Sequence, residues 1–262
     1  QRQLCIRDRH RAILEWLSQH GSISNTDIQK NFDVSYDSAK RDLRILEEKG
    51  LLKRTHGGAL PIRQIAAGRP ETMTFKDIPQ VKPNYLQIAK EAVSLIQEND
   101  VIYIPSTTLG LFMVKNLPEH LKIKVVTNSI LIADELRTLT NVSVIILGGE
   151  MDNKGNCCDT IAVETVKRLR LDKCFITSAC ISASFGLSIQ STPYISFFNA
   201  LIDSSKLTIG LYPKEKIGFD SIVSICPANR LNTLITDWDS SEQDLSLFDK
   251  LGIKVIVVDN PE

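Results

Sequence analysis

The stretch that decides the fold is residues 9–58, RHRAILEWLSQHGSISNTDIQKNFDVSYDSAKRDLRILEEKGLLKRTHGG. Apolar residues recur at helical spacing in three short segments of it, which predicts three helices. The first helix is expected to end at Gly21. Ser24, with Asp27 three residues later, is typical of an N-cap pair that begins the second helix.

The third helix has an apolar side and a basic side. Ser35 caps its start and is also a candidate DNA contact. Three apolar residues recur on one face: Ala39, Leu43 and Leu46. The basic residues fall on the other face: Lys40, Arg41 and Arg44. Such a helix suits the major groove of DNA, because its first turn, with Tyr36 and Ser38, can reach base edges while Lys and Arg contact phosphates.

A short hairpin is predicted after the third helix. Residues 51–55 read LLKRT and residues 59–60 read AL, with a glycine turn between them. Its candidate DNA contacts are Lys53, Arg54, Thr55, His56 and Gly57. A solvated charged helix in an ordinary small helical domain is the alternative, but the added basic wing favours a winged helix-turn-helix that binds DNA.

Charge is divided unevenly along the chain. Residues 1–63 hold 12 Lys and Arg against 8 Asp and Glu, whereas the 262-residue chain holds 31 of each. The remainder is therefore acidic, with 19 basic and 23 acidic residues. A basic head on an acidic body indicates a polyanionic partner for the head alone. The excess is modest, so two heads acting together would bind far better than one.

Composition predicts a cytoplasmic protein with a small head and a larger body. The hydrophobic content of 43% is enough for a core, and no apolar run is long enough for a membrane span. The six cysteines show no zinc-like pairing, so buried free thiols in a reducing compartment are expected. The adjacent pair Cys157-Cys158 leaves a thiol sensor as an alternative that nothing nearby in the sequence supports.

From Tyr85 onward, apolar strands alternate with amphipathic helices. This pattern predicts an α/β domain with a largely parallel sheet covered on both faces. Helices are expected at residues 88–96, 109–117, 130–139, 161–169, 195–203 and 245–251. Strands are expected at residues 101–104, 124–127, 142–147, 174–177, 208–211, 233–235 and 255–258.

Small and hydroxylic residues follow the first strands of this predicted sheet. They are Ser106, Thr107 and Thr108, then Thr127, Asn128 and Ser129, then Gly148 and Gly149. Ligands bind beyond the carboxyl ends of strands in such sheets, and helix N-termini with Ser and Thr hydroxyls suit phosphates or polyols. Ordinary N-caps and turn glycines are the alternative for each loop taken alone.

The chain resembles the DeoR family of bacterial transcription regulators over nearly its whole length. The resemblance is strongest over residues 34–43, VSYDSAKRDL, and residues 54–59, RTHGGA. It implies a recognition helix and a wing in the head, and a sugar-phosphate sensor domain similar to ribose-5-phosphate isomerase in fold. The resemblance also carries the family's ligand loops onto residues 105–108, 127–128 and 148–149, its Gly-Leu turn onto Gly186, and its late Lys onto Lys216.

The body also departs from the family pattern. Pro105 stands where the family usually has Asp or Gly, and the stretches around Ser182 and Tyr212 lack the usual acids. The family's frequent Lys before the first body helix is replaced by residues 84–87, NYLQ. Two interpretations follow: an unusual ligand, or a body that has lost sensing and serves in assembly.

These observations predict a winged helix-turn-helix domain at residues 1–62, a linker at 63–84, and an effector-sensing and oligomerisation domain at 85–262. The expected function is a bacterial, nucleoid-associated repressor of a carbohydrate-related operon, with double-stranded DNA, a phosphorylated sugar or polyol, and further copies of itself (dimer or tetramer) as partners. No cofactor, metal or catalytic residue is expected. An isomerase-like enzyme is the alternative, but the missing acids argue against it.

Overall fold

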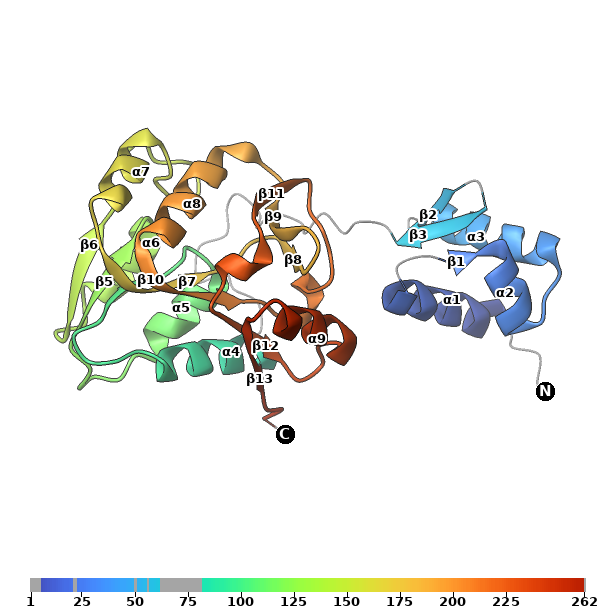
Figure 1. The fold of residues 1–262 in the computed structure, drawn as a ribbon, viewed down its shortest axis with the longest axis horizontal. Helices are drawn as coiled ribbons and strands as arrows, with labels where there is room; N and C mark the ends of the chain where they lie inside the picture. Colours follow the sequence, from blue (N-terminus) through green and yellow to red (C-terminus); the bar gives the residue numbers. More distant parts are fainter. Residues whose placement is uncertain (1–5, 21–22, 50, 56, 62–81, 262) are drawn as a thin grey trace. The chain divides into compact units, whose positions relative to one another are not determined.

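The computed structural model describes residues 6–20, 23–49, 51–55, 57–61 and 82–261. The chain divides into two compact units, residues 1–64 and residues 65–262, which are treated separately below (Figure 1). None of the helices in the described part of the chain has the length and apolar character needed to span a membrane.

The head is a helical domain with a small sheet, as predicted. Its elements are α1 (Ile6–His20), β1 (Ile23–Ser24), α2 (Asn25–Phe32), α3 (Tyr36–Glu48), β2 (Leu52–Thr55) and β3 (Gly58–Pro61). The predicted cap of α2 is confirmed, because Ser24 and Asp27 form a reciprocal capping box. Strands β2 and β3 pair antiparallel to form the wing, and β1 pairs with the other edge of β3.

One apolar core holds the head together. Its buried side chains come from all three helices and the small sheet: Ile13, Leu17, Ile23, Ile28, Ala39, Leu43, Leu46, Leu52 and Ala59. Ala39, Leu43 and Leu46 are the apolar face predicted for α3, and each is almost fully buried. Burial of this face turns the opposite side of α3 toward solvent.

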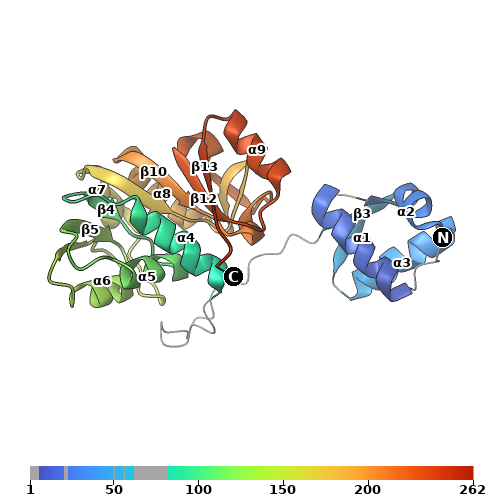
Figure 2. The same ribbon diagram turned by 90° about the horizontal axis from the view of Figure 1, so that it is seen from below.

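The body contains the predicted parallel sheet. In the described residues it has seven strands in the order β13-β12-β10-β7-β4-β5-β6, all paired parallel (Figures 1 and 2). The strands are β4 (Val101–Tyr103), β5 (Ile123–Thr127), β6 (Val142–Ile146), β7 (Leu171–Ile176), β10 (Ser205–Leu211), β12 (Thr233–Asp237) and β13 (Lys254–Val258). The order reverses between β4 and β7, which is where ligands bind in sheets of this kind.

Helices cover both faces of the sheet. One core joins it to α4 (Pro83–Ser94), α5 (Thr108–Lys115) and α6 (Ile130–Leu136). The other joins it to α7 (Thr160–Lys167), α8 (Ile195–Asp203) and α9 (Glu242–Lys250). In Figure 2, α4, α5 and α6 lie along one side of the sheet. The arrangement is the three-layer α/β fold that the alternating pattern predicts.

Two features of the body were not predicted. A second, antiparallel sheet in the order β11-β9-β8 is formed by β8 (Cys180–Ser182), β9 (Gly186–Ile189) and β11 (Val223–Cys226). Helix α4 begins at Pro83, inside the stretch assigned to the linker, because proline is well suited to the first turn of a helix. Residues 62–81 lie outside the described residues, so the linker and its boundaries stay a prediction.

Candidate DNA-binding surface and effector site

The start of α3 is built by two serines. The Ser35 hydroxyl accepts a hydrogen bond from the Ser38 backbone N–H at 3.2 Å, and the two hydroxyl oxygens lie 2.9 Å apart. Capping satisfies a backbone donor that the helix leaves unpaired. Ser35 therefore has a structural role. The Ser38 hydroxyl already has a hydrogen-bond partner within the chain in the absence of DNA.

The outer face of α3 is basic and open to solvent. Lys40, Arg41 and Arg44 are exposed, and so is Tyr36 in the first turn. The Lys40 ammonium lies 4.8 Å from the centre of the Tyr36 ring, which is a cation–π contact. Arg44 lies 3.8 Å from Glu48 in an exposed ion pair. The structure thus places these four predicted residues on one accessible surface.

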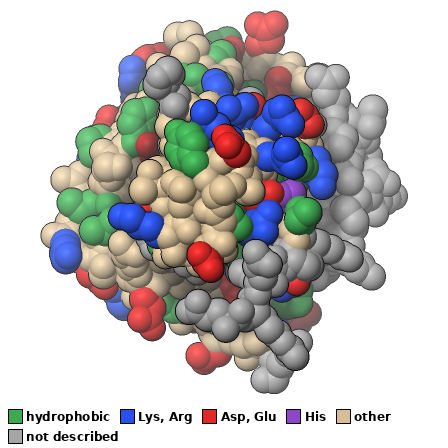
Figure 3. Space-filling view, turned by 90° about the vertical axis from the view of Figure 1, so that its right-hand side faces the viewer, with side chains coloured by type: hydrophobic (Ala, Val, Ile, Leu, Met, Phe, Trp, Pro, Cys, Tyr) green, Lys and Arg blue, Asp and Glu red, His purple; other side chains and the backbone are tan. Residues whose placement is uncertain are grey.

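The wing adds further exposed basic residues. Lys53, Arg54 and Thr55 lie exposed on β2, and Gly57 is exposed at the turn. Figure 3 shows Lys and Arg side chains gathered on one face of the protein, with a minority of Asp and Glu among them. His56 lies outside the described residues, so its predicted contact stays a prediction.

Glu47, Asn25 and Ile23 fix the wing against the helices. The Glu47 carboxylate accepts a hydrogen bond from the Arg54 N–H at 2.9 Å, and the Asn25 N–H donates to the Gly57 carbonyl at the same distance. Gly58 admits no side chain, because a Cβ there would lie 2.0 Å from the Ile23 carbonyl oxygen. These contacts therefore fix the position of the basic wing relative to α3.

A buried charge cluster that the sequence analysis missed joins α1 to the recognition helix. Asp42 is 3% exposed, and its carboxylate accepts from the Arg9 guanidinium at 2.6 and 3.2 Å. His10 Nε2 lies 3.0 Å from the same carboxylate. Asp42 sits within the basic stretch of α3 but points inward, so it positions the helix rather than contacting DNA.

The loop after β4 caps the next helix. Ser106, Thr107 and Thr108 are half-buried, and the Thr107 hydroxyl accepts from the Gly110 N–H at 3.2 Å as the N-cap of α5. Gly110 is packed so closely that a Cβ would lie 1.9 Å from the Pro105 carbonyl oxygen. The loop is thus closely packed against α5, and the Thr107 hydroxyl caps that helix.

The loop after β5 is buried and engaged by neighbours. Asn128 Oδ1 accepts from the Tyr103 hydroxyl at 2.8 Å, and its amide nitrogen lies 3.0 Å from the Cys158 sulfur. Thr127 accepts from the Ser129 N–H, and Ser129 caps α6. All three predicted residues lie together at the carboxyl end of β5, but each already has a partner inside the chain.

The loop after β6 is arranged around Asp159. Gly149 has a φ of +138°, and a Cβ on it would lie 2.1 Å from Asp159 Oδ1. Asp159 also accepts from the Glu150 N–H at 3.0 Å and caps α7. Gly148 and Gly149 are exposed. Glycine is required at position 149 both by its backbone conformation and by the nearby carboxylate.

Lys216 reaches the carboxyl end of β7. Its ammonium donates to the Thr177 hydroxyl at 3.3 Å and to the Ser178 carbonyl at 3.1 Å. Within the described part of the chain, no carboxylate lies within ion-pair distance of it. Burial lowers the pKa of Lys216. A half-buried cation with only neutral hydrogen-bond partners is suited to receiving an anion.

Two further positions relate to the departures noted in the sequence. Tyr212 is fully buried, with its oxygen 2.7 Å from the Ser178 hydroxyl, and so packs beside the Lys216 contacts. The Ser182 hydroxyl donates to the carboxylate of Asp220 at 2.5 Å, so an acid from another part of the chain contacts this stretch. Sequence spacing gave no signal for Asp220, because it lies far along the chain from Ser182.

Gly186 is accounted for by the turn that it occupies. Its φ is +81°, and a Cβ there would lie 2.1 Å from the Cys226 carbonyl oxygen. It lies in the second sheet, paired with Ser182. The family resemblance assigned it to the effector site, but the local geometry gives it a role in the turn between β8 and β9.

The five cysteines in the described part of the chain have the character of inert thiols, and Cys5 lies outside it. Burial raises the pKa of Cys158 and of Cys174 to about 12 and that of Cys226 to about 11. The pKa of Cys157 is also raised, first by burial and then by Asp159. Thiols with raised pKa values stay protonated at neutral pH and react slowly, so the thiol-sensor alternative gains no support.

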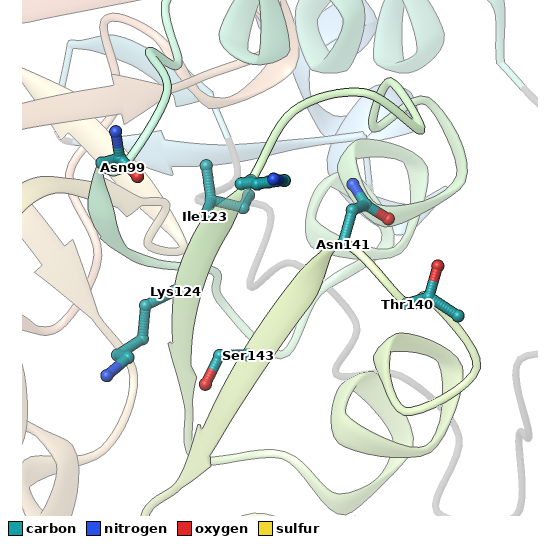
Figure 4. Close-up of a pocket in the computed structure, with 7 residues that line it drawn as sticks. Asn99, Ile123, Lys124, Thr140, Asn141 and Ser143 are labelled. Carbon is teal, nitrogen blue, oxygen red and sulfur yellow. The ribbon is translucent and has the colours of Figure 1, made fainter.

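A hollow of about 340 Å³ lies at the opposite edge of the sheet (Figure 4). It is lined by Asn99, Lys122, Ile123, Lys124, Thr140, Asn141 and Ser143. These residues lie at the amino ends of the strands, away from the loops described above. The Asn141 amide already donates to the Pro118 and Leu121 carbonyls. This hollow lies at the amino ends of β5 and β6 and is not the predicted effector site.

Curated relatives match the chain from end to end. The HTH-type transcriptional repressor GlcR of Bacillus subtilis is 29% identical over 252 residues, covering 96% of this chain and 96% of that protein. The HTH-type transcriptional regulator GolR of Listeria innocua is 26% identical over 255 residues, covering 96% and 98%. The glycerol-3-phosphate regulon repressor of Haemophilus influenzae is 26% identical over 228 residues, covering 87% and 88%.

A solved structure with a similar fold is ribose 5-phosphate isomerase A from Methanocaldococcus jannaschii. It aligns with a TM-score of 0.37 and 13% identity over 53% of this chain and 53% of that chain. A likeness of this size bears on neither substrate nor activity.

Two family models match the two units. The model described as a DeoR-like helix-turn-helix domain matches residues 9–64, and the model described as a DeoR C terminal sensor domain matches residues 84–238. The second match alone spans more than half of the chain. The exposed basic face of α3 and the parallel-sheet body agree with these assignments. The chain belongs to the DeoR family, and it is a DNA-binding transcriptional regulator rather than an enzyme.

Proposed function

We propose that this protein is a repressor of a carbohydrate-related operon that a phosphorylated sugar or polyol releases from DNA. The single observation that carries the DNA half is the exposed basic face of α3, formed by Lys40, Arg41 and Arg44 and flanked by the basic wing. Recognition by such a helix uses phosphate contacts for position and first-turn side chains for bases, here Tyr36 and Ser38.

The effector half rests on Lys216. A half-buried ammonium beside the switch point between β4 and β7, with only the Thr177 hydroxyl and a carbonyl as partners, favours an anionic ligand. The Ser106 and Thr108 hydroxyls, at the neighbouring end of β4, would bind the polar part of a sugar or polyol. The name of one relative, the glycerol-3-phosphate regulon repressor, agrees with this ligand class.

Two heads are needed for tight binding, so the active form is proposed to be a homo-oligomer whose body supplies the symmetry. Its operator would carry repeated half-sites about one helical turn apart, or a multiple of it. The protein would act at the nucleoid in the bacterial cytoplasm.

A body that only assembles is the second candidate, and the loop after β5 favours it. Asn128 is 4% exposed and is engaged by Tyr103 and Cys158, so a ligand would have to replace those contacts. Buried Pro105 and Tyr212 fill space next to the same loops. This candidate keeps the DNA-binding function and removes the effector.

One screen separates the two candidates. Thermal unfolding and operator binding are measured with glucose 6-phosphate, sorbitol 6-phosphate, glycerol 3-phosphate and their unphosphorylated parents. A true effector present at 100 times its Kd stabilises the body by about 2.7 kcal/mol through mass action. A phosphorylated compound that both stabilises the protein and weakens operator binding supports the repressor with a sensor. Unchanged melting and operator affinity with all of them leaves the body as an assembly domain.

A further inference from the structure

The loop that carries Lys216 is tied to the first turn of α4. It follows β10 and includes the short 3-10 helix η3 (Lys214–Lys216). Helix α4 packs against β12, β10 and β13, so its start lies next to the ends of β10 and β12. Lys82, the residue before α4, directly follows residues 62–81, which join the body to the head along the chain.

Asp237 forms the central contact. It is the last residue of β12 and is 1% exposed. One oxygen of its carboxylate, Oδ2, accepts from the Asn84 side-chain amide at 3.0 Å and from the Lys214 N–H at 2.9 Å. A buried carboxylate needs such donors, because an unsatisfied one is costly. A single oxygen thus holds together the first turn of α4 and the loop two residues before Lys216.

A second contact between the same two segments lies closer to the protein surface. The Lys82 ammonium donates to Glu215 Oε1 at 3.0 Å and lies 5.6 Å from the centre of the Tyr85 ring. The Tyr85 hydroxyl hydrogen-bonds to Glu215. Glu215 immediately precedes Lys216. The Lys82 side chain is 66% exposed, so this pair alone contributes little, but it joins the same two segments as Asp237.

We propose that Asn84, Asp237, Lys82 and Glu215 form a latch through which occupancy of Lys216 is transmitted to the part of the body that leads to the head. An anion that draws the Lys216 side chain toward itself pulls on the loop at residues 214–216. The loop then either keeps or breaks two contacts: that of the Lys214 N–H with Asp237, which also binds Asn84, and that of Glu215 with Lys82. These four are positioning residues, since none of them needs to touch the ligand.

The inference rests on the proposed function in one respect, the anion at Lys216. It goes further by naming the start of α4 as the part of the body through which effector binding alters operator binding. It also gives a role to Asn84, which stands within the NYLQ stretch that departs from the family pattern. Coupling between two sites requires an element with two arrangements that both sites bias, and the latch at the start of α4 is that element.

The loop offers a matched control. The Lys214 ammonium forms an ion pair with Asp239 at 2.7 Å, and both side chains are about half exposed. This pair lies on the same loop but does not include α4. Asp239→Ala therefore removes one contact of the loop while leaving the latch intact. Lys82→Arg serves as the conservative variant, because arginine keeps the ion pair with Glu215.

The first experiment needs no ligand. Hydrogen exchange of residues 214–218 is measured in the full chain and in Asn84→Ala, Lys82→Ala, Lys82→Arg and Asp239→Ala. Asn84→Ala should speed exchange of the loop amides by about tenfold or more, as expected for loss of a hydrogen bond to a charged group. Lys82→Ala should give a smaller increase that Lys82→Arg reverses. Equal exchange in Asn84→Ala and Asp239→Ala would overturn the latch.

The second experiment measures the response. The ratio of operator Kd with and without glucose 6-phosphate or inorganic phosphate is compared among the same variants, together with the affinity for that probe. In Asn84→Ala and Lys82→Ala the ratio should fall toward one while the affinity for the probe stays within about threefold. An unchanged ratio contradicts the latch. If no probe changes operator binding by the unaltered chain, the proposed effector fails, and the exchange experiment alone decides the latch.

Discussion

The recognition helix and the loops at the carboxyl edge of the sheet both present polar side chains, but they hold them differently. On α3, Lys40 and Arg41 are exposed to solvent, whereas Asp42 is buried and contacts Arg9 and His10. At the end of β5, Asn128 and Ser129 are themselves buried and hydrogen-bonded within the chain. DNA can therefore meet a surface that is already formed, whereas the proposed effector would have to replace contacts within the protein at this loop.

The largest expected effect is the loss of stability caused by removing the buried carboxylate of Asp42, which positions α3. Asp42→Ala leaves Arg9 and His10 without their carboxylate, and removing one partner of a buried pair costs about 3–5 kcal/mol. Urea unfolding of the head, followed by Trp16 fluorescence in a Trp238→Phe background, measures it. Asp37→Ala, on the exposed side of the first turn, is the control and should cost less than about 1 kcal/mol. Equal stability of the two variants would refute the positioning role of Asp42.

Next come the exposed arginines. Arg41→Ala and Arg44→Ala should weaken operator binding without lowering stability, because neither side chain is in the core. A lost base contact costs about 1–3 kcal/mol at one operator position, and a lost phosphate contact lowers the salt slope by about 1. Because Arg44 forms an ion pair with Glu48, the loss of operator affinity should be larger for Arg41→Ala than for Arg44→Ala. Titrations at several salt concentrations that leave affinity unchanged in both variants would exclude this face from the interface.

Lys216→Ala tests the body in the same way. It should weaken binding of a phosphorylated effector by about tenfold or more and leave operator affinity unchanged. Burial lowers the pKa of Lys216, so its charge is lost at a lower pH than that of an ordinary lysine. Effector affinity should therefore decline as pH rises through that range. Calorimetry across pH is the measurement, and a pH-independent affinity would indicate that Lys216 does not face the anion.

Thr107 shows why the body is harder to probe than the head. Thr107→Val removes the hydroxyl that caps α5 and should lower stability by about 1 kcal/mol, apart from any effect on ligand. Thr107→Ser keeps the cap and should be close to neutral. Thermal unfolding measures the first effect and effector titration the second. If valine reduces effector binding no more than the stability loss explains, Thr107 acts only as a cap.

The smallest effect is expected for the thiols. Because the pKa of Cys158 is about 12, its thiol is protonated at pH 8 and becomes a thiolate only as pH rises toward that value. Alkylation at pH 8, read by mass spectrometry, should be slow at Cys157, Cys158 and Cys174 and fast only after unfolding. Rapid labelling of Cys158 in the folded protein would show that the region around Asn128 opens in solution.

Much of the fold could be predicted because its signals are local. Residues 195–203 were predicted as a helix and form α8, and the apolar runs at 124–127 and 142–147 correspond closely to β5 and β6. The capping box at Ser24 and the apolar face of α3 were equally visible, since each depends on residues within one or two turns.

The remaining features depend on residues far apart in the chain. Strands β8 and β9 are short and include serines, so they gave no periodic signal. They are defined by their pairing with each other and by the pairing of β9 with β11. Asp42 resembled one more charge on a polar helix, and only the fold brings Arg9 and His10 to it. The contact of Asn84 with Asp237 likewise spans most of the body. The predicted effector residues after β4, β5 and β6 lie at the carboxyl ends of the parallel strands, whereas Gly186 lies in the second sheet. The internal hydrogen bonds of the first group could not be foreseen.

Asp159 makes the three loops at that edge unequal. Helix α5 begins with a neutral threonine, whereas α7 begins with a carboxylate that already occupies the place where an incoming anion would be attracted. A phosphate brought to Gly148 and Gly149 would meet a like charge, and the pKa of Asp159 is lowered, first by the Glu150 N–H, so that charge persists in mild acid. For the proposed phosphorylated effector, this carboxylate disfavours a phosphate at the glycines and leaves Lys216 as the expected phosphate contact.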